Sequence, residues 1–145
     1  MSQENVDLVR ALQPPPDVDL TEMFARGDEK RAAREIEGAS AAFTDDFVCV
    51  FHALSSEERS GVVGLRQAWL DWLEPWDTYR AEIDRLSDAG DRVLIFSRDF
   101  GRRSGMEDEI ELKASAVWWV RDGKVSRAEF FVDRADALRA AGLSG

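Results

Sequence analysis

The stretch EIELKASAVWWVRDGKVSRAEFFVD, residues 109–133, decides the fold. It contains two strand-like runs joined through Asp122-Gly123, and Asp-Gly between alternating runs is the strongest short-range signal for a β-hairpin. Polar and apolar side chains alternate along both runs, so each strand has one apolar face. We therefore predict a long antiparallel hairpin, with one buried face that needs a curved partner from the rest of the chain.

The chain has 145 residues, enough for one domain over 1–145 with its own core. Its net charge of −10 argues against nucleic acid or anionic membranes as partners. A single cysteine, Cys49, excludes a disulfide framework and a thiolate metal cluster. The chain shows neither a run of membrane-spanning length nor the apolar stretch of a signal peptide. We expect a cytoplasmic protein.

The remaining patterns place helices before the hairpin and strands beside it. They predict a helix over 3–12 and a Pro-rich spacer up to residue 16, helical segments over 20–43 interrupted near Gly27 and Gly38, a strand over 47–53, a helix over 62–74, and strands over 79–84 and 92–102. A last helix would begin after Asp133 as its N-cap and end at Gly142. Helices followed by a meander of strands indicate the α+β class.

Three segments carry a resemblance to a known family: WLDWLEPWDTYRAEI at 69–83, DAGDRVLIFSRDFGR at 88–102, and AVWWVRDGKVSRAEFFVDRADALRAAGL at 116–143. In this order they resemble SnoaL-like members of the nuclear transport factor 2-like superfamily. The resemblance implies a curved, mostly antiparallel sheet wrapped around N-terminal helices into a cone with an apolar cavity. It leaves the activity open, because this family includes polyketide cyclases, limonene-epoxide hydrolase-like enzymes, ketosteroid isomerase-like enzymes and members without a known reaction.

The expected cavity would be lined by the apolar face of the hairpin. The small alanines on this face leave room in front of Trp118 and Phe130, and Trp69 on the preceding helix could form a roof. The alternative is that these are ordinary core positions. The candidate pocket residues are Trp69, Leu112, Ala114, Ala116, Trp118, Phe130 and Val132.

Asp99 is the sharpest candidate for chemistry. Both faces of the strand over 92–102 carry apolar residues, so periodicity does not decide which one points inward, and the resemblance to the epoxide hydrolases favours the face of Asp99. In an apolar cavity the pKa of this carboxyl group would rise, as a general acid or base requires near neutral pH. The alternative is a surface carboxylate paired with Arg98, Arg102 or Arg103.

His52 is the only histidine and lies near the end of the first predicted strand. It would be a structural residue, or, if it faced the cavity, a proton shuttle with Asp99. One histidine and one cysteine form no zinc constellation, and the sequence contains no phosphate loop and no nicotinamide fingerprint. We therefore expect neither a metal nor a cofactor.

The resemblance does not extend to two known catalytic patterns. Limonene-epoxide hydrolase has an Arg-x-Asp pair on this strand and a further aspartate in the last strand, where this chain has Asp99, Gly101 and Phe130. Epoxide hydrolysis is therefore not implied. The isomerase pattern is also absent, because Tyr79, the only tyrosine, does not match the position of the isomerase tyrosine.

Two functions that use the cavity remain open at this point, and a third possibility is that the chain's own side chains fill the cavity and the domain serves only interaction. One is the binding of a small, apolar, cyclic molecule in the cavity. The alternative is a cofactor-independent cyclase or isomerase that uses Asp99 as its acid or base. The opposite face of the hairpin carries Val117, Trp119 and Phe131, an apolar patch that predicts a homodimer unless the C-terminal helix or residues 1–12 cover it.

Overall fold

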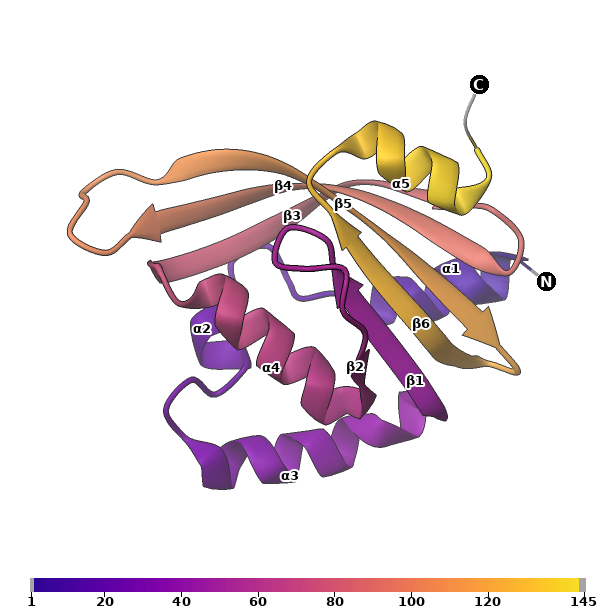
Figure 1. The fold of residues 1–145 in the computed structure, drawn as a ribbon, viewed down its shortest axis with the longest axis horizontal. Coiled ribbons are helices and arrows are strands. Elements are labelled where there is room, and N and C mark those ends of the chain that lie inside the picture. The colour runs from indigo at the N-terminus through magenta and orange to yellow at the C-terminus, as the bar shows by residue number, and fades with distance from the viewer. Residues whose placement is uncertain (1, 144–145) are drawn as a thin grey trace.

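A curved, unclosed sheet forms the body of the computed structural model, which describes residues 2–143 (Figure 1). Within these residues six strands follow the order β2-β1-β6-β5-β4-β3. Strands β3 to β6 form the predicted antiparallel meander, whereas β1 is parallel to β6. The strands are β1 (Phe43–Phe51), β2 (Arg59–Ser60), β3 (Trp76–Asp88), β4 (Arg92–Arg103), β5 (Ile110–Arg121) and β6 (Lys124–Phe131).

The predicted hairpin is formed by β5 and β6, which turn through Asp122 and Gly123. Both turn residues have positive φ, 54° and 75°. This conformation is typical of the tight turns whose twist matches that of the adjoining strands. Arg121 pairs with Lys124 directly across the turn. The hairpin prediction is therefore confirmed, and its apolar face forms part of the concave side of the sheet.

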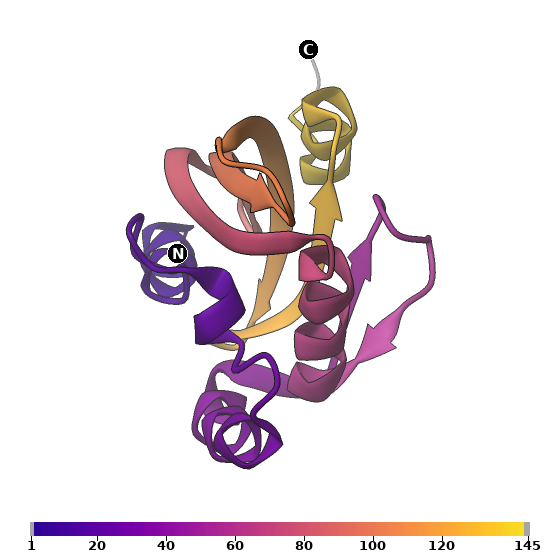
Figure 2. The ribbon, with the colours of Figure 1, turned by 90° about the vertical axis from the view of Figure 1, so that its left-hand side faces the viewer.

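Helices cover both sides of the sheet (Figure 2). The predicted interruption near Gly27, where φ is 84°, is confirmed, because Asp28 caps a new helix there. The interruption predicted near Gly38 is also confirmed, because this helix ends at Ala39, one residue later, and a short 3-10 turn follows. The helices are α1 (Ser2–Ala11), α2 (Leu20–Met23), α3 (Glu29–Ala39), the short 3-10 turn η1 (Ser40–Ala42), α4 (Gly61–Leu73) and α5 (Arg134–Ala141).

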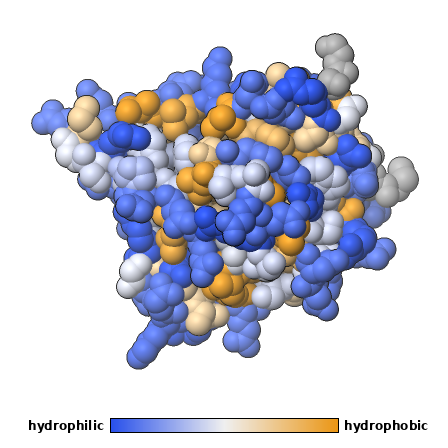
Figure 3. Space-filling model, viewed as in Figure 1, coloured by the Kyte–Doolittle hydropathy of each residue, from blue (hydrophilic) through white to orange (hydrophobic). Residues whose placement is uncertain are grey.

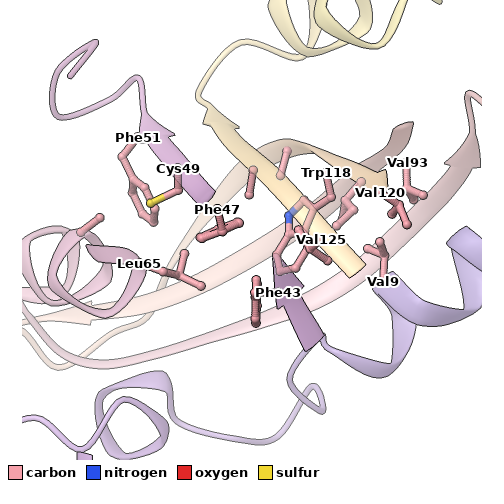
Figure 4. Packing of buried hydrophobic residues seen from close by; sticks show 14 of the residues in the cluster. Val9, Phe43, Phe47, Cys49, Phe51, Leu65, Val93, Trp118, Val120 and Val125 are labelled. Carbon is pink, nitrogen blue, oxygen red and sulfur yellow. The ribbon is translucent and has the colours of Figure 1, made fainter. Parts of the chain in front are cut away.

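The main core lies inside the curve of the sheet, where α1, β1 and α4 meet β4, β5 and β6 (Figure 4). Strand β1 begins at Phe43, earlier than predicted, because the Phe43 ring packs edge-on against Phe47 at 4.8 Å between ring centres and Phe43 pairs with Val125. Each such buried side chain contributes about 1.5–3 kcal/mol. The labelled members are Val9, Phe43, Phe47, Cys49, Phe51, Leu65, Val93, Trp118, Val120 and Val125.

Helix α5 covers the outer face of the hairpin. Val117 is fully buried there, in a cluster with Ala137 and Ala141 of α5, and Trp119 and Phe131 are half-buried beside it. The small alanines let the helix approach the sheet closely. Helix α5 therefore covers the part of the predicted dimer patch around Val117, as in the alternative of a covering C-terminal helix, and Trp119 and Phe131 stay partly exposed.

Hydrophilic side chains dominate the face of the molecule seen in Figure 3, and apolar ones appear there as scattered patches. Among residues 2–143, no helix combines the length and the apolar composition needed to cross a bilayer. Helix α5 begins as predicted, with Asp133 accepting a hydrogen bond from the Ala135 amide at 2.8 Å, and ends at Gly142, whose φ is 75°.

Candidate functional site

A cavity of about 260 Å³, called here the main cavity, opens between α4, the end of β1 and the concave face of the sheet. It exists because β6 ends at Phe131, opposite Ser115, while β5 extends back to Ile110 without a partner on that side. The lining residues are Phe51, Ala53, Trp69, Trp72, Tyr79, Asp99, Leu112, Lys113, Ala114, Ser115, Phe130, Phe131 and Val132.

Trp69 of α4 forms the roof of this cavity. Its ring meets those of Phe51 and Phe130 edge-on, at 5.1 and 5.5 Å between ring centres, and stacks on Phe24 at 5.4 Å. Edge-on and stacked aromatic pairs are favourable beyond the area that they bury. The roof is therefore held in place by contacts on several sides before any ligand binds.

Asp99 on β4 lies at the inner end of the main cavity and is only 4% exposed. Its Oδ2 accepts a hydrogen bond from the Tyr79 hydroxyl at 2.7 Å, and its Oδ1 accepts one from the Ser97 hydroxyl at 2.8 Å. Burial raises the pKa of Asp99, and the two hydrogen bonds oppose this only in part. The result is a carboxyl group that binds a proton more tightly than a surface aspartate does.

The alternative of a surface ion pair does not describe Asp99. Arg98 pairs with Glu82 and Asp84, and Arg102 pairs with Asp77. In the described part of the chain, neither a lysine nor an arginine bonds to Asp99, whose contacts are neutral hydroxyl groups. A buried carboxylate without a cation is costly when charged, and such groups are concentrated at functional sites.

Tyr79 is a site residue that the sequence analysis did not select. It lies on β3, beside the pairing of Ala81 with Asp99, and its hydroxyl reaches across to the carboxylate. Burial and the neighbouring negative charge raise the pKa of Tyr79 far above its usual range, so the phenol remains a donor. The sequence shows that Tyr79 and Ala81 lie on the same face of their strand. It does not show how β3 and β4 are aligned, and this alignment brings the Tyr79 hydroxyl to Asp99.

Gly101 determines how the Tyr79 ring is seated. A Cβ atom at this position would lie 2.5 Å from the Trp76 ring and 2.9 Å from the Tyr79 ring. The two rings therefore occupy the space that a side chain would need.

Gly101→Ala should lower the free energy of unfolding by about 1–3 kcal/mol, because overpacking forces Trp76 or Tyr79 to move. Urea denaturation measures the change. The control is Gly38→Ala inside α3, where a Cβ atom meets nothing within 4 Å. This control should be more stable than the unmodified protein by about 0.5–1 kcal/mol. A Gly101→Ala protein as stable as the unmodified chain would contradict the packing argument.

The structure divides the predicted pocket residues into three groups. Trp69, Leu112, Ala114, Phe130 and Val132 line the main cavity. Ala116 instead lines a second cavity of about 60 Å³ behind Asp99, called here the inner cavity. Trp118 lines neither of these cavities: it is 6% exposed and packs between Phe43 and Phe130, because α1 and β1 fill that end of the cone.

The structure does not bring His52 together with Asp99. The His52 ring stacks on Phe131 at 4.6 Å, and its Nε2 lies 2.7 Å from Oε1 of Glu129. These partners flank Phe130 in β6, so they lie on the opposite face of the strand from the side chain that meets Trp69. Burial raises the pKa of Glu129, but hydrogen bonds from His52 and Arg127 outweigh it, and the net pKa is lowered. The shuttle expected from His52 therefore has no geometric basis.

Within residues 2–143, no three histidine, cysteine, aspartate or glutamate side chains are grouped so that they could hold a metal ion. Asp99 and Tyr79 line the main cavity, and Ser97, which borders the inner cavity, is joined to Asp99 by a hydrogen bond.

Comparison with known proteins identifies solved structures of the same shape. A putative SnoaL-like polyketide cyclase from Jannaschia sp. CCS1 is 18% identical, with a TM-score of 0.64 over 99% of this chain and 94% of that one. TerC co-crystallised with polyporic acid is 18% identical, with a TM-score of 0.62 over 96% and 98%. A hypothetical protein from Catenulispora acidiphila with a ketosteroid isomerase-like fold, in complex with trimethylamine, is 17% identical, with a TM-score of 0.57 over 74% and 82%.

At these identities the likeness to solved structures establishes the fold, and the chemistry must be argued from the site. A search of curated proteins found no match. The model of the SnoaL-like domain family matches residues 19–128, which contain β1 to β5 and most of the cavity wall. By this match the chain belongs to the family of SnoaL-like domains.

Proposed function

We propose that the main cavity binds a small, flat, largely apolar cyclic molecule. The observation that carries this proposal is the cavity itself, in which aromatic and aliphatic walls surround one buried carboxyl group, Asp99. Its volume of about 260 Å³ is near the lower limit of known ligand sites, roughly 300–1,000 Å³. A compact ligand is therefore favoured. The complexes of TerC with polyporic acid and of the Catenulispora protein with trimethylamine support small-molecule binding in this fold.

A second candidate function is proton transfer at carbon, as in cofactor-independent cyclases and isomerases. It is favoured by the burial of Asp99, which raises the pKa of this group although the hydrogen bonds from Tyr79 and Ser97 oppose the rise in part. An oxygen of the Asp99 carboxylate would take a proton from the carbon beside a ligand carbonyl, and the electrons of the broken C–H bond would pass to the carbonyl oxygen. Return of the proton to another atom of the resulting enolate would complete an isomerisation.

Tryptophan fluorescence tests the binding proposal, because Trp69 and Trp72 line the main cavity. Titration with acetophenone and its longer alkyl homologues should quench the emission saturably. Trp69→Phe should reduce the quenched amplitude while leaving the affinity within a few-fold. The matched control is Trp119→Phe on the other side of the sheet, which should leave the amplitude unchanged. Linear, unsaturable quenching by every ketone would contradict binding in this cavity.

Proton transfer has a separate measurement. In heavy water, nuclear magnetic resonance follows the loss of hydrogen from the carbon beside the carbonyl of a bound ketone. The protein should accelerate this exchange above the buffer rate. If ketones bind but their exchange is not accelerated, proton transfer is contradicted and the protein binds its ligand without this chemistry.

A further inference from the structure

The main cavity and the inner cavity meet at the Asp99 carboxyl group. The inner cavity extends from this point toward the spacer between α1 and α2, away from the open mouth of the cone. Five residues line both cavities, so the two spaces lie on either side of the same side chains. They are Trp69, Asp99, Ala114, Ser115 and Phe130.

The two oxygens of Asp99 accept hydrogen bonds from residues that line different cavities. Tyr79, which donates to Oδ2, lines the main cavity and not the inner one. Ser97, which donates to Oδ1, lines the inner cavity and not the main one. A ligand atom that meets the carboxyl group in the main cavity therefore lies next to the inner cavity.

The inner cavity is small and presents mainly aliphatic surface. Ala81 of β3, Ile95 of β4 and Ala116 of β5 contribute apolar walls, and Ile83 of β3, which is 38% exposed, forms the edge toward solvent. Its volume of about 60 Å³ is that of a short alkyl group, since one water molecule occupies about 30 Å³ in the liquid.

The polar side chains that border the inner cavity already have partners. The Ser97 hydroxyl donates to Asp99, and the Ser115 hydroxyl donates to the Phe131 carbonyl oxygen at 3.3 Å. Gln13 donates from Nε2 to the Val9 carbonyl oxygen at 3.1 Å, which fixes the spacer over the end of the cavity. A polar substituent would find few free partners there, whereas an alkyl group needs none.

We propose, on the basis of the function proposed above, that the ligand is a flat apolar ketone with a short alkyl chain. The ring lies under Trp69 in the main cavity, the carbon beside the carbonyl meets Asp99, and the chain enters the inner cavity. The residues that select chain length are Ala81, Ile83 and Ala116, and the Gln13-Pro14 spacer closes the far end.

The test is a titration series of aryl ketones that differ only in the alkyl chain: acetophenone, propiophenone, butyrophenone, valerophenone and hexanophenone. Tryptophan quenching gives a dissociation constant for each. Every methylene that is buried should tighten binding by about four-fold. The affinity should rise over the first members and stop rising at the chain length that fills the inner cavity.

Variants of the inner cavity should move this limit. Ile83→Ala should shift it to a longer ketone, and Ala116→Val should shift it to a shorter one while leaving acetophenone affinity within about two-fold. Ala81→Val repeats the second test from a different strand, so one poorly folded variant does not decide the result. The control is Ala53→Val, which borders only the main cavity and should leave the limit unchanged.

The outcomes separate the two proposals. Saturable binding with the same chain-length limit in all variants would overturn the role of the inner cavity and leave the proposed function standing. Saturable binding with no limit along the series would also overturn it, because the chain would then leave through the open mouth. Failure of every ketone to bind would overturn both proposals.

Discussion

Asp99→Asn should slow proton transfer from a bound ketone by about 100- to 10,000-fold, the usual contribution of a positioned acid or base. Ligand affinity should change little, because asparagine has nearly the same shape. The same substitution should remove a pH dependence of stability that the unmodified protein shows. Heavy-water exchange and urea denaturation at several pH values measure the two effects.

The sign of the pH effect follows from the raised pKa of Asp99. The unfolded chain releases this proton near the ordinary aspartate pKa of about 3.9, and the folded protein releases it at higher pH. The stability due to the neutral carboxyl group is fully present below the unfolded pKa. It falls as pH rises toward the folded pKa and is constant above it. The Asp99→Asn protein lacks this fall.

Asp77→Asn is the matched control, because Asp77 is an exposed carboxylate on the neighbouring strand, paired with Arg102. It should retain the fall in stability. If the stability of the Asp99→Asn protein depends on pH in the same way as that of the unmodified protein, the pKa of Asp99 is not raised in the folded state. The argument for acid–base chemistry would then be lost.

Arg66→Met should lower the free energy of unfolding by about 2–4 kcal/mol. The Arg66 side chain is buried, and its guanidinium donates from Nε to the Phe24 carbonyl oxygen at 2.7 Å and from Nη2 to the Ala25 carbonyl oxygen at 2.9 Å. Methionine fills similar space but leaves both oxygens without these donors. Thermal denaturation should show a melting temperature roughly 6–12 °C lower.

Glu29→Gln is the control for this substitution. Glu29 also bonds to the Arg66 guanidinium, but its side chain is 79% exposed, and an exposed ion pair contributes about 1 kcal/mol or less. Equal stability of the two variants would contradict the importance of the buried carbonyl bonds. Because Phe24 stacks on Trp69, Arg66→Met should also weaken ketone quenching.

Much of the fold could be predicted because it depends on how polar and apolar residues alternate over short stretches of the sequence. The alternation over 109–133 and the Asp-Gly turn specify the hairpin without any distant contact. The placement of Asp99 required the family resemblance as well, because both faces of its strand carry apolar residues. The SnoaL-like family and its curved sheet agree with the resemblance seen in the sequence.

The parts of the site that could not be predicted depend on how strands that are separate in the sequence are aligned with each other. The bond from Tyr79 to Asp99 requires β3 and β4 to pair with irregularities near Trp76 and Ile83. Trp118 lies on the same strand face as the cavity residues. Alternation along a strand does not show which part of that face borders the cavity and which part is packed against α1 and β1. His52 lies beyond the last residue of β1, where strand parity no longer fixes the direction of a side chain.

The parallel pairing of β1 with β6 has a consequence for the order in which the chain folds. These strands are neighbours in space but are separated in sequence by residues 52–123, about half of the chain, so their pairing closes a long loop and is slow compared with that of the hairpins. During synthesis, β1 can pair only with the two-residue strand β2 until residues 124–131 have left the ribosome. We therefore expect nascent chains that stop before β6 to be cut readily by proteases, and the cavity to form only as the last step.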